Sequence, residues 1–216
     1  MAQNVKYSED TIMDAMASDF TAKIEENPRD HHVCPWWVGY LIASPLRKLG
    51  ENPDTILTPL IEPGMTAVDI GCAMGFFSLP LARMVGESGR VVCVDVQERM
   101  LAALERRARR KGLDHTIETR LATQEDLGLE DLEGAADLLL AIHVLHETAY
   151  PRRFLTRCLD TLRPGGKLLV IEPKGHVSAE AFEASRLQAI EVGFSEVEPR
   201  ELKKSRGLLL EKPEVD

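Results

Sequence analysis

The sequence contains little of what a disulfide-bonded or membrane-spanning protein needs. Its four cysteines, Cys34, Cys72, Cys93 and Cys158, include no CxxC pair and follow no regular spacing. A reduced protein without a disulfide framework is therefore the simplest interpretation. No apolar run approaches the roughly 20 residues that cross a bilayer, and the polar, acidic residues 1–20 do not resemble a signal peptide. We expect a cytoplasmic protein without membrane insertion.

Positive charge is also scarce. The chain has 26 Lys and Arg against 35 Asp and Glu, a formal net charge of -9 and a pI near 5.2. A protein that binds nucleic acid as its main partner usually carries clustered lysine and arginine. The one dense basic run, residues 105–113, comes late in an expected helix and is interpreted as a solvated helix face. We expect no nucleic-acid partner, and the sequence does not indicate an oligomeric state.

An alternation of strands and helices is present instead, from about Thr66 to the end. It predicts an α/β protein with a mostly parallel sheet, right-handed crossovers and helices on both faces. The last two strands leave no room for a helix between them, so they should form a hairpin with one antiparallel strand. Pro80 predicts a short or bent helix after the first strand. The expected strands are 65–71, 89–96, 115–122, 136–144, 167–173, 194–201 and 206–212, and the expected helices are 76–86, 97–112, 150–162 and 178–193.

The first part of the chain differs from the rest, and we divide the sequence into an N-terminal helical lid or extension, 1–60, and a main domain, 61–216. The stretch "HHVCPWW" (31–37) holds two histidines, a cysteine and both tryptophans. Its aromatic rings could shield a reaction from water, although packing of this segment onto the domain is the favoured interpretation. A metal site there is conceivable, but the spacing matches no standard zinc pattern, and we expect no metal.

The stretch "TAVDIGCAMGFFSLPLA" (66–82) indicates a strand, a glycine turn and a helix. In open parallel sheets, ligands bind outside the carboxyl ends of the strands, where the strand order reverses. Gly71 and Gly75 allow a ligand to approach the main chain closely, and the following helix directs N–H groups at the same place.

The turn fits the dinucleotide fingerprint G-x-G-x-x-G poorly, because Ala73 replaces its middle glycine. Asp69, just before the turn, would repel a diphosphate and favour an ammonium group. Asp95, at the end of the second strand, is placed to accept hydrogen bonds from ribose hydroxyls, as in both classes of ligand. The pattern favours a ligand with adenosine at one end and a cationic amino acid at the other.

Three stretches carry a family resemblance: "VDIGCAMGFFSLPLA", "VVCVDVQERML" and "LRPGGKLLVIEP". In order and spacing they resemble motif I, the acidic second-strand motif and the L-x-P-G-G-x-L motif of class I S-adenosylmethionine-dependent methyltransferases. The resemblance covers roughly residues 52–212 and is closest to the small-molecule branch that includes quinone-biosynthesis and arsenite methyltransferases. It implies a Rossmann-like seven-stranded sheet with a reversed last strand, and S-adenosyl-L-methionine as cofactor.

The resemblance also assigns cofactor contacts to the first two motifs. It implies that Gly71, Cys72 and Gly75 line the methionine and sugar parts of the cofactor. Asp69 would stabilise the ammonium side, and Asp95 would bind the ribose.

Further contacts implied by the resemblance lie on the following strands. Val96 would pack against adenine, and Ala141, at the end of the fourth strand, would lie beneath the methionine. Relatives often place an Asp against the adenine amino group where this chain has Thr123. The adenine contact therefore falls to Thr123, Gln124 or the backbone.

The methyl acceptor should meet the cofactor after strands four and five. His143 and His146, with Glu147 adjacent, follow the fourth strand, and His176 follows the fifth. Each histidine is a candidate base for a thiol, phenol or amine-type acceptor, or else a structural histidine or helix cap. The N-P-P-Y-type tetrapeptide that follows strand four in many amino-group methylases of nucleic acids is missing here. Arsenite methyltransferases present several cysteines to the metalloid, whereas here only Cys34 is well placed. We predict a small acceptor methylated on sulfur, oxygen or carbon.

Two other functions remain open at this point. One is an NAD-dependent oxidoreductase on a similar sheet, which would bind NAD(H) and transfer a hydride. The other is a catalytically silent module that binds the cofactor without turnover. A doubly wound domain whose glycine turn binds nothing is the remaining structural interpretation.

Overall fold

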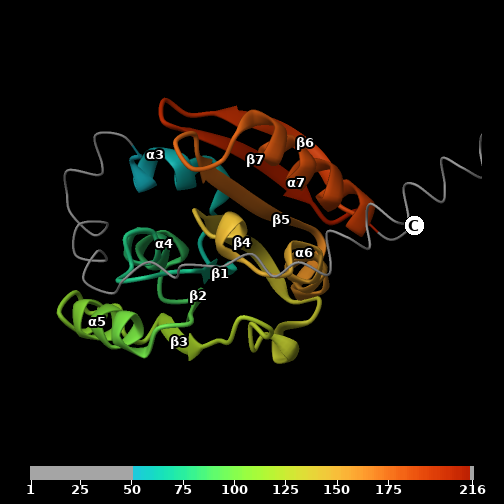
Figure 1. The fold of residues 1–216 in the computed structure, drawn as a ribbon. Coiled ribbons are helices and arrows are strands. Elements are labelled where there is room, and N and C mark those ends of the chain that lie inside the picture. The colour runs from blue at the N-terminus through green and yellow to red at the C-terminus, as the bar shows by residue number, and fades with distance from the viewer. Residues whose placement is uncertain (1–50, 215–216) are drawn as a thin grey trace, which may run out of the picture. The chain divides into compact units, whose positions relative to one another are not determined.

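The computed structural model describes residues 51–214 (Figure 1). The segment "HHVCPWW" and the other predictions made for residues 1–50 lie outside the described residues. The predicted domain division at residue 60 stays a prediction. Within 51–60 the chain forms the short helix α3 (Pro53–Leu57) and the 3-10 turn η2 (Thr58–Leu60).

The sheet has seven strands in the order β3-β2-β1-β4-β5-β7-β6. Strands β1 to β5 pair in parallel, and β7 pairs antiparallel with both β5 and β6. The predicted mostly parallel sheet with a reversed last strand is confirmed. The strands are β1 Thr66–Ile70, β2 Arg90–Asp95, β3 Ile117–Leu121, β4 Ala136–Ile142, β5 Leu162–Pro173, β6 Ser195–Glu201 and β7 Ser205–Glu211.

Helices cover both faces of the sheet, as predicted (Figure 1). Alternate residues of each strand point to opposite faces. In β1, Ala67 packs in the core with α3, α4 and α5, whereas Val68 packs in the core with α6 and α7. The other elements are α4 Ser78–Val85, α5 Glu98–Arg109, η3 Glu130–Leu132, η4 Leu145–Glu147, α6 Pro151–Thr161 and α7 Ala179–Val192.

Helix α4 is short, as Pro80 predicted, with eight residues and the proline in its first turn. Strand β5 begins earlier than expected, because it includes the "RPGG" stretch. Its pairing with β4 shifts between Ala136 and Leu138. Gly166 allows this irregularity, since a Cβ there would lie 2.9 Å from the Ala136 carbonyl oxygen.

The strand order reverses at β1, which lies between β2 and β4. The loops after β1, β2 and β4 therefore emerge at one edge of the sheet. This is the place where an open α/β sheet binds its ligand.

Candidate functional site

A cavity of about 400 Å³ opens at this edge. Its size falls within the range of small-molecule and cofactor sites. Its wall is formed by the segments after β1, β2, β3 and β4 and by the outer face of α6. The predicted residues on the wall are Asp69, Gly71, Cys72, Asp95, Val96, Thr123, Gln124 and His143. The predicted residues that lie off the wall are Gly75, Ala141, His146 and His176.

The loop after β1 has an unusual backbone that its sequence permits. Gly71 has φ +70°, and a Cβ there would overlap the Val144 side chain. Ala73 also has a positive φ, of 45°, which is uncommon for a residue with a side chain. The N–H group of Ala73 donates to Asp95 Oδ2 at 2.9 Å. The loop is thus tied to the end of β2 by a hydrogen bond to the carboxylate predicted to bind ribose.

The other side of this loop packs on α5. A Cβ at Gly75, where φ is +80°, would overlap Leu104, so glycine allows close packing here and does not form the wall. Arg107, one turn further along α5, donates a hydrogen bond to the Met74 carbonyl. Burial lowers the pKa of Arg107. Sequence reasoning assigned the basic run to solvent and missed this contact, although Arg107 follows the packed Ala103 by four residues.

Asp69 is anchored by a serine of the helix that follows the glycine turn. Its side chain is buried, and its Oδ2 accepts a hydrogen bond from Ser78 Oγ at 2.5 Å. Ser78 is the first residue of α4. The serine therefore fixes the carboxylate at the foot of the cavity.

Asp95 ends β2 and is almost fully buried. Its Oδ1 accepts the Gln97 N–H at 2.9 Å, while its Oδ2 accepts that of Ala73. Burial raises the pKa of Asp95, and the backbone hydrogen bonds act in the opposite direction. A carboxylate oxygen can accept more than one hydrogen bond, so both oxygens can still receive hydroxyl donors from the cavity.

The wall after β2 and β3 combines an apolar surface with a polar turn. Val96 is 40% exposed there, which leaves apolar area for a flat ring. Thr123 closes the turn, because its Oγ1 accepts the N–H groups of Glu125 and Asp126 at 3.2 and 3.0 Å. The Thr123 hydroxyl keeps its own proton for donation, and Gln124 lies beside it on the wall.

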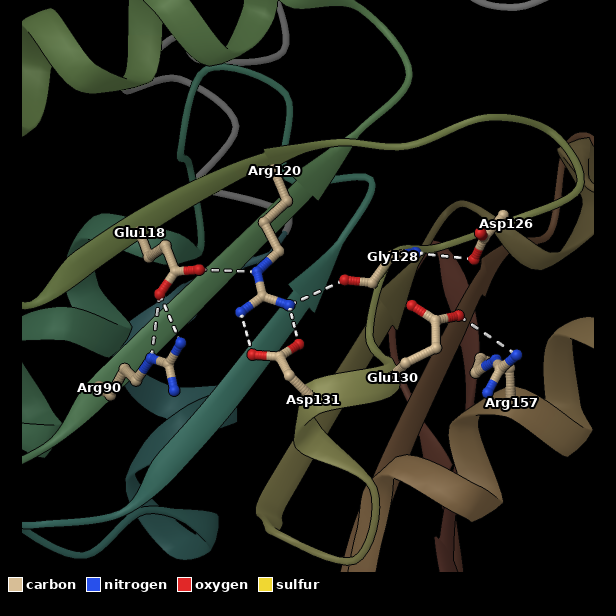
Figure 2. A network of polar contacts seen from close by, with 8 residues as sticks. All are labelled: Arg90, Glu118, Arg120, Asp126, Gly128, Glu130, Asp131 and Arg157. Carbon is tan, nitrogen blue, oxygen red and sulfur yellow. Dashed lines mark hydrogen bonds and ion pairs between the residues drawn. The ribbon is translucent and has the colours of Figure 1, made fainter.

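A polar network fixes the position of this loop (Figure 2). Arg120 on β3 donates to Glu118 at 2.7 Å, to the Gly128 carbonyl at 2.8 Å and to Asp131. Asp131 foremost, and Glu118 with it, raise the pKa of Arg120, whereas burial acts in the opposite direction. The remaining members of the network are Arg90, Asp126, Glu130 and Arg157. Through them the loop is connected to β2 and to α6.

His143 follows β4 with a positive φ of 61°. Its N–H donates to the Ile171 carbonyl at 2.7 Å, and its Nε2 lies 3.0 Å from Glu51 Oε1. Ser205 Oγ donates to the same glutamate oxygen at 2.5 Å and lies 3.5 Å from His143 Nε2. Ser205 and Glu51 thus approach the same ring nitrogen of His143, Nε2. A hydrolase triad needs them on opposite nitrogens, so this group does not form one.

His146 turns away from the cavity toward β5. Its Nδ1 is hydrogen-bonded to the carboxylate of Glu172, and its N–H donates to the same side chain at 3.3 Å. The bond to Glu172 is the main reason that the pKa of His146 is raised. The His176 ring stands edge-on to the His146 ring, with 6.0 Å between the centroids. Of the three predicted histidines, only His143 lies on the cavity wall.

Two further side chains of the wall differ in chemistry. Burial raises the pKa of the Cys72 thiol well above its ordinary value, which keeps it protonated and poorly nucleophilic. Glu147, the last residue of η4, is half-buried on the wall, and burial raises the pKa of its carboxyl group. Sequence reasoning noted Glu147 only as a neighbour of His146.

The described residues, 51–214, lack two features, a metal-binding cluster and a helix suited to span a membrane. Within this range no group of three or more His, Cys, Asp and Glu side chains is arranged to hold a metal ion. In the same part of the chain, no helix has both the length and the apolar character required to cross a membrane.

Comparison with known proteins points to one family. A family model described as a methyltransferase domain matches residues 68–170, from β1 to β5. A ubiquinone biosynthesis O-methyltransferase of Caulobacter vibrioides is 36% identical over 107 residues, which are 50% of this chain and 40% of that protein. One from Rhizobium etli is 28% identical over 156 residues, 72% of this chain and 59% of that protein. The chain thus spans about half the length of these relatives.

Solved structures share the fold. A SAM-dependent methyltransferase from Aquifex aeolicus has a TM-score of 0.76 and 23% identity, covering 83% of this chain and 100% of that one. An arsenic(III) S-adenosylmethionine methyltransferase from Chlamydomonas reinhardtii has a TM-score of 0.56 and 19% identity, covering 71% of this chain and 64% of that one. At these identities the likeness establishes the fold alone.

Proposed function

Because the chain belongs, through residues 68–170, to the class I S-adenosylmethionine-dependent methyltransferase family, we propose that it transfers the methyl group of S-adenosylmethionine to a small molecule. One observation carries this proposal. The Asp95 carboxylate is held by two backbone N–H groups at the carboxyl end of β2, on the wall of a cavity of about 400 Å³. That arrangement suits the two hydroxyls of a ribose.

The residues of the wall fit the rest of the cofactor. Val96 offers an apolar surface to adenine, and Thr123 and Gln124 offer polar groups to its edge. Asp69 and the loop after β1, with Gly71, would face the methionine part. The cofactor supplies a methyl group already activated by its sulfonium, so the protein's task is to align the acceptor and exclude water.

The loop after β1 argues against a dinucleotide. The N–H group of Ala73 is bonded to Asp95, so a diphosphate there would meet a carboxylate beside it. Asp69 adds a second buried acid at the same turn. Anions bind where backbone N–H groups point at them without a competing acid. A sulfonium nucleoside matches this charge better than NAD does.

A small oxygen, sulfur or carbon nucleophile remains the proposed acceptor. The relatives are named ubiquinone biosynthesis O-methyltransferases, which supports oxygen as the atom that receives the methyl group. His143 is the predicted base that lies on the wall, whereas His146 and His176 lie off it. The proposal therefore keeps His143 as the histidine that faces an acceptor.

Transfer of label tests the proposal. The protein is incubated with methyl-labelled S-adenosylmethionine and a metabolite extract, and labelled small molecules are identified by mass spectrometry. We expect one labelled product class with the wild-type protein and none with Asp95→Ala. Binding of S-adenosylhomocysteine without any labelled product would favour the silent cofactor-binding module instead.

A further inference from the structure

Glu147 lies on the cavity wall directly after β4, and the inference drawn from it rests on the proposed function. We propose that its carboxylate takes the proton of the methyl acceptor, so that the acceptor is a hydroxyl or thiol that loses a proton on methylation. Glu147 ends η4, directly after β4, and its side chain lies on the cavity wall with those of His143 and Val144. It is the one acid of the segment 143–148, and the other acids of the wall come from β1, from the end of β2, from the loop after β3 and from α6.

The neighbouring acids at this edge are already engaged with imidazoles. Glu51, 6% exposed, is bonded to His143 and Ser205. Glu172, 2% exposed, is bonded to His146 through both its oxygens. Each buried acid holds one histidine in place. Glu147 belongs to neither of these pairs, and it lies on the cavity wall.

The charges around Glu147 favour proton uptake. Burial is the main cause of its raised pKa, and the carboxylates of Glu172 and Asp95 raise the pKa further. His146 and His143 act in the opposite direction. A carboxylate whose pKa lies above the ordinary value is a stronger proton acceptor.

The step is balanced without any additional reactant. Glu147 receives the proton that an acceptor hydroxyl or thiol loses as its oxygen or sulfur joins the methyl carbon, and the cofactor sulfur keeps the electron pair of the broken bond. The products are the methylated acceptor, S-adenosylhomocysteine and a protonated Glu147, which returns its proton to water after release.

Sinefungin tests this placement without knowledge of the acceptor. In this analogue a carbon bearing an amine replaces the sulfur bearing the methyl group, so a positive charge stands near the position of the transferred group. A carboxylate facing that position binds sinefungin through a charge-assisted hydrogen bond. S-adenosylhomocysteine lacks the amine and serves as the reference ligand.

Isothermal titration calorimetry of both ligands gives the decisive comparison. We expect the wild-type protein to bind sinefungin more tightly than S-adenosylhomocysteine. Glu147→Gln should weaken sinefungin binding about tenfold or more, the loss of one charged hydrogen bond, and change S-adenosylhomocysteine binding less than about twofold. Glu125→Gln, which removes another carboxylate of the wall, should leave the ratio of the two affinities unchanged.

The wild-type protein supplies a second measurement that does not depend on how the variant folds. Its preference for sinefungin should fall as the pH is lowered through the raised pKa of Glu147, since the protonated acid loses its charge. An equal effect of Glu147→Gln on both ligands, or a preference that does not change with pH, would overturn the assignment. Failure of the wild-type protein to bind either nucleoside would instead overturn the proposed function, and this inference with it.

Discussion

Replacing Gly71 with alanine tests the close approach between the loop after β1 and Val144. Gly71 has φ +70°, and a Cβ there falls inside 3.0 Å of Val144 Cγ2. A side chain in this backbone region costs about 1–2 kcal/mol. Crowding a filled space costs about 1–3 kcal/mol more. We expect Gly71→Ala to lower the free energy of unfolding by the sum, about 2–5 kcal/mol.

Gly134 separates the two contributions. Its φ is +67°, but a Cβ there meets no atom within 4 Å, so Gly134→Ala should cost only the backbone part, about 1–2 kcal/mol. Val144→Ala removes the methyl group that Gly71→Ala would crowd. In a double-mutant cycle it should restore about 1–3 kcal/mol. Urea unfolding followed by circular dichroism measures the wild-type protein, the three single variants and the double variant. Equal losses for Gly71→Ala and Gly134→Ala, or no coupling with Val144→Ala, would refute the close approach.

The other predictions concern Arg107 on α5, His146 on η4 and Arg120 on β3. Arg107→Met removes the hydrogen bond to the Met74 carbonyl in the loop after β1, and it should weaken S-adenosylhomocysteine binding about tenfold by calorimetry. Arg110→Met, at an exposed position of the same region, should leave that binding unchanged. The bond to Glu172 raises the pKa of His146, so the stability that it provides is complete below the unfolded pKa, about 6.5, and is lost as the pH rises through the folded pKa. Glu172→Gln should abolish this loss of stability with rising pH, measured by urea unfolding at a series of pH values. If the loss persists in the variant, another group causes it. Arg120→Met should lower the free energy of unfolding by about 1 kcal/mol, because its acidic partners are partly exposed; no change in a thermal melt would contradict the network.

Most of the fold could be predicted from local patterns. The apolar runs of the strands and the lengths between them are features of short windows, and the structure places the strand ends within a few residues of those expected. The early start of β5 was missed. Its bulge depends on pairing with Ala136 across the sheet, which no short window around the "RPGG" stretch contains.

The site was predictable where a motif and a strand end coincide. Gly71 and Asp95 follow β1 and end β2, so the topology alone brings them to one edge. The histidines could not be separated in the same way. His143 lies on the cavity wall, whereas His146 is hydrogen-bonded to Glu172. The positive φ at His143, between β4 and η4, is a conformation that no feature of the sequence indicates.

Contacts between distant segments were also beyond the sequence. Glu51 meets His143 across 92 positions of the chain, and Arg107 meets the Met74 carbonyl across 33. Both depend on how helices and loops settle on the finished sheet. Neither pair forms a spacing pattern that could be recognised beforehand.

In the proposed function, the turn after β1 and the carboxylate of Asp95 hold the adenosine-containing cofactor of a methyltransferase. Calorimetric titration with S-adenosylhomocysteine and with NAD tests it most directly, in the wild-type protein and in Asp95→Ala. We expect the wild-type protein to bind S-adenosylhomocysteine and not NAD. Asp95→Ala should weaken the binding of S-adenosylhomocysteine about tenfold or more, through the loss of charged hydrogen bonds. Tighter binding of NAD, or an affinity for S-adenosylhomocysteine that Asp95→Ala leaves unchanged, would contradict it.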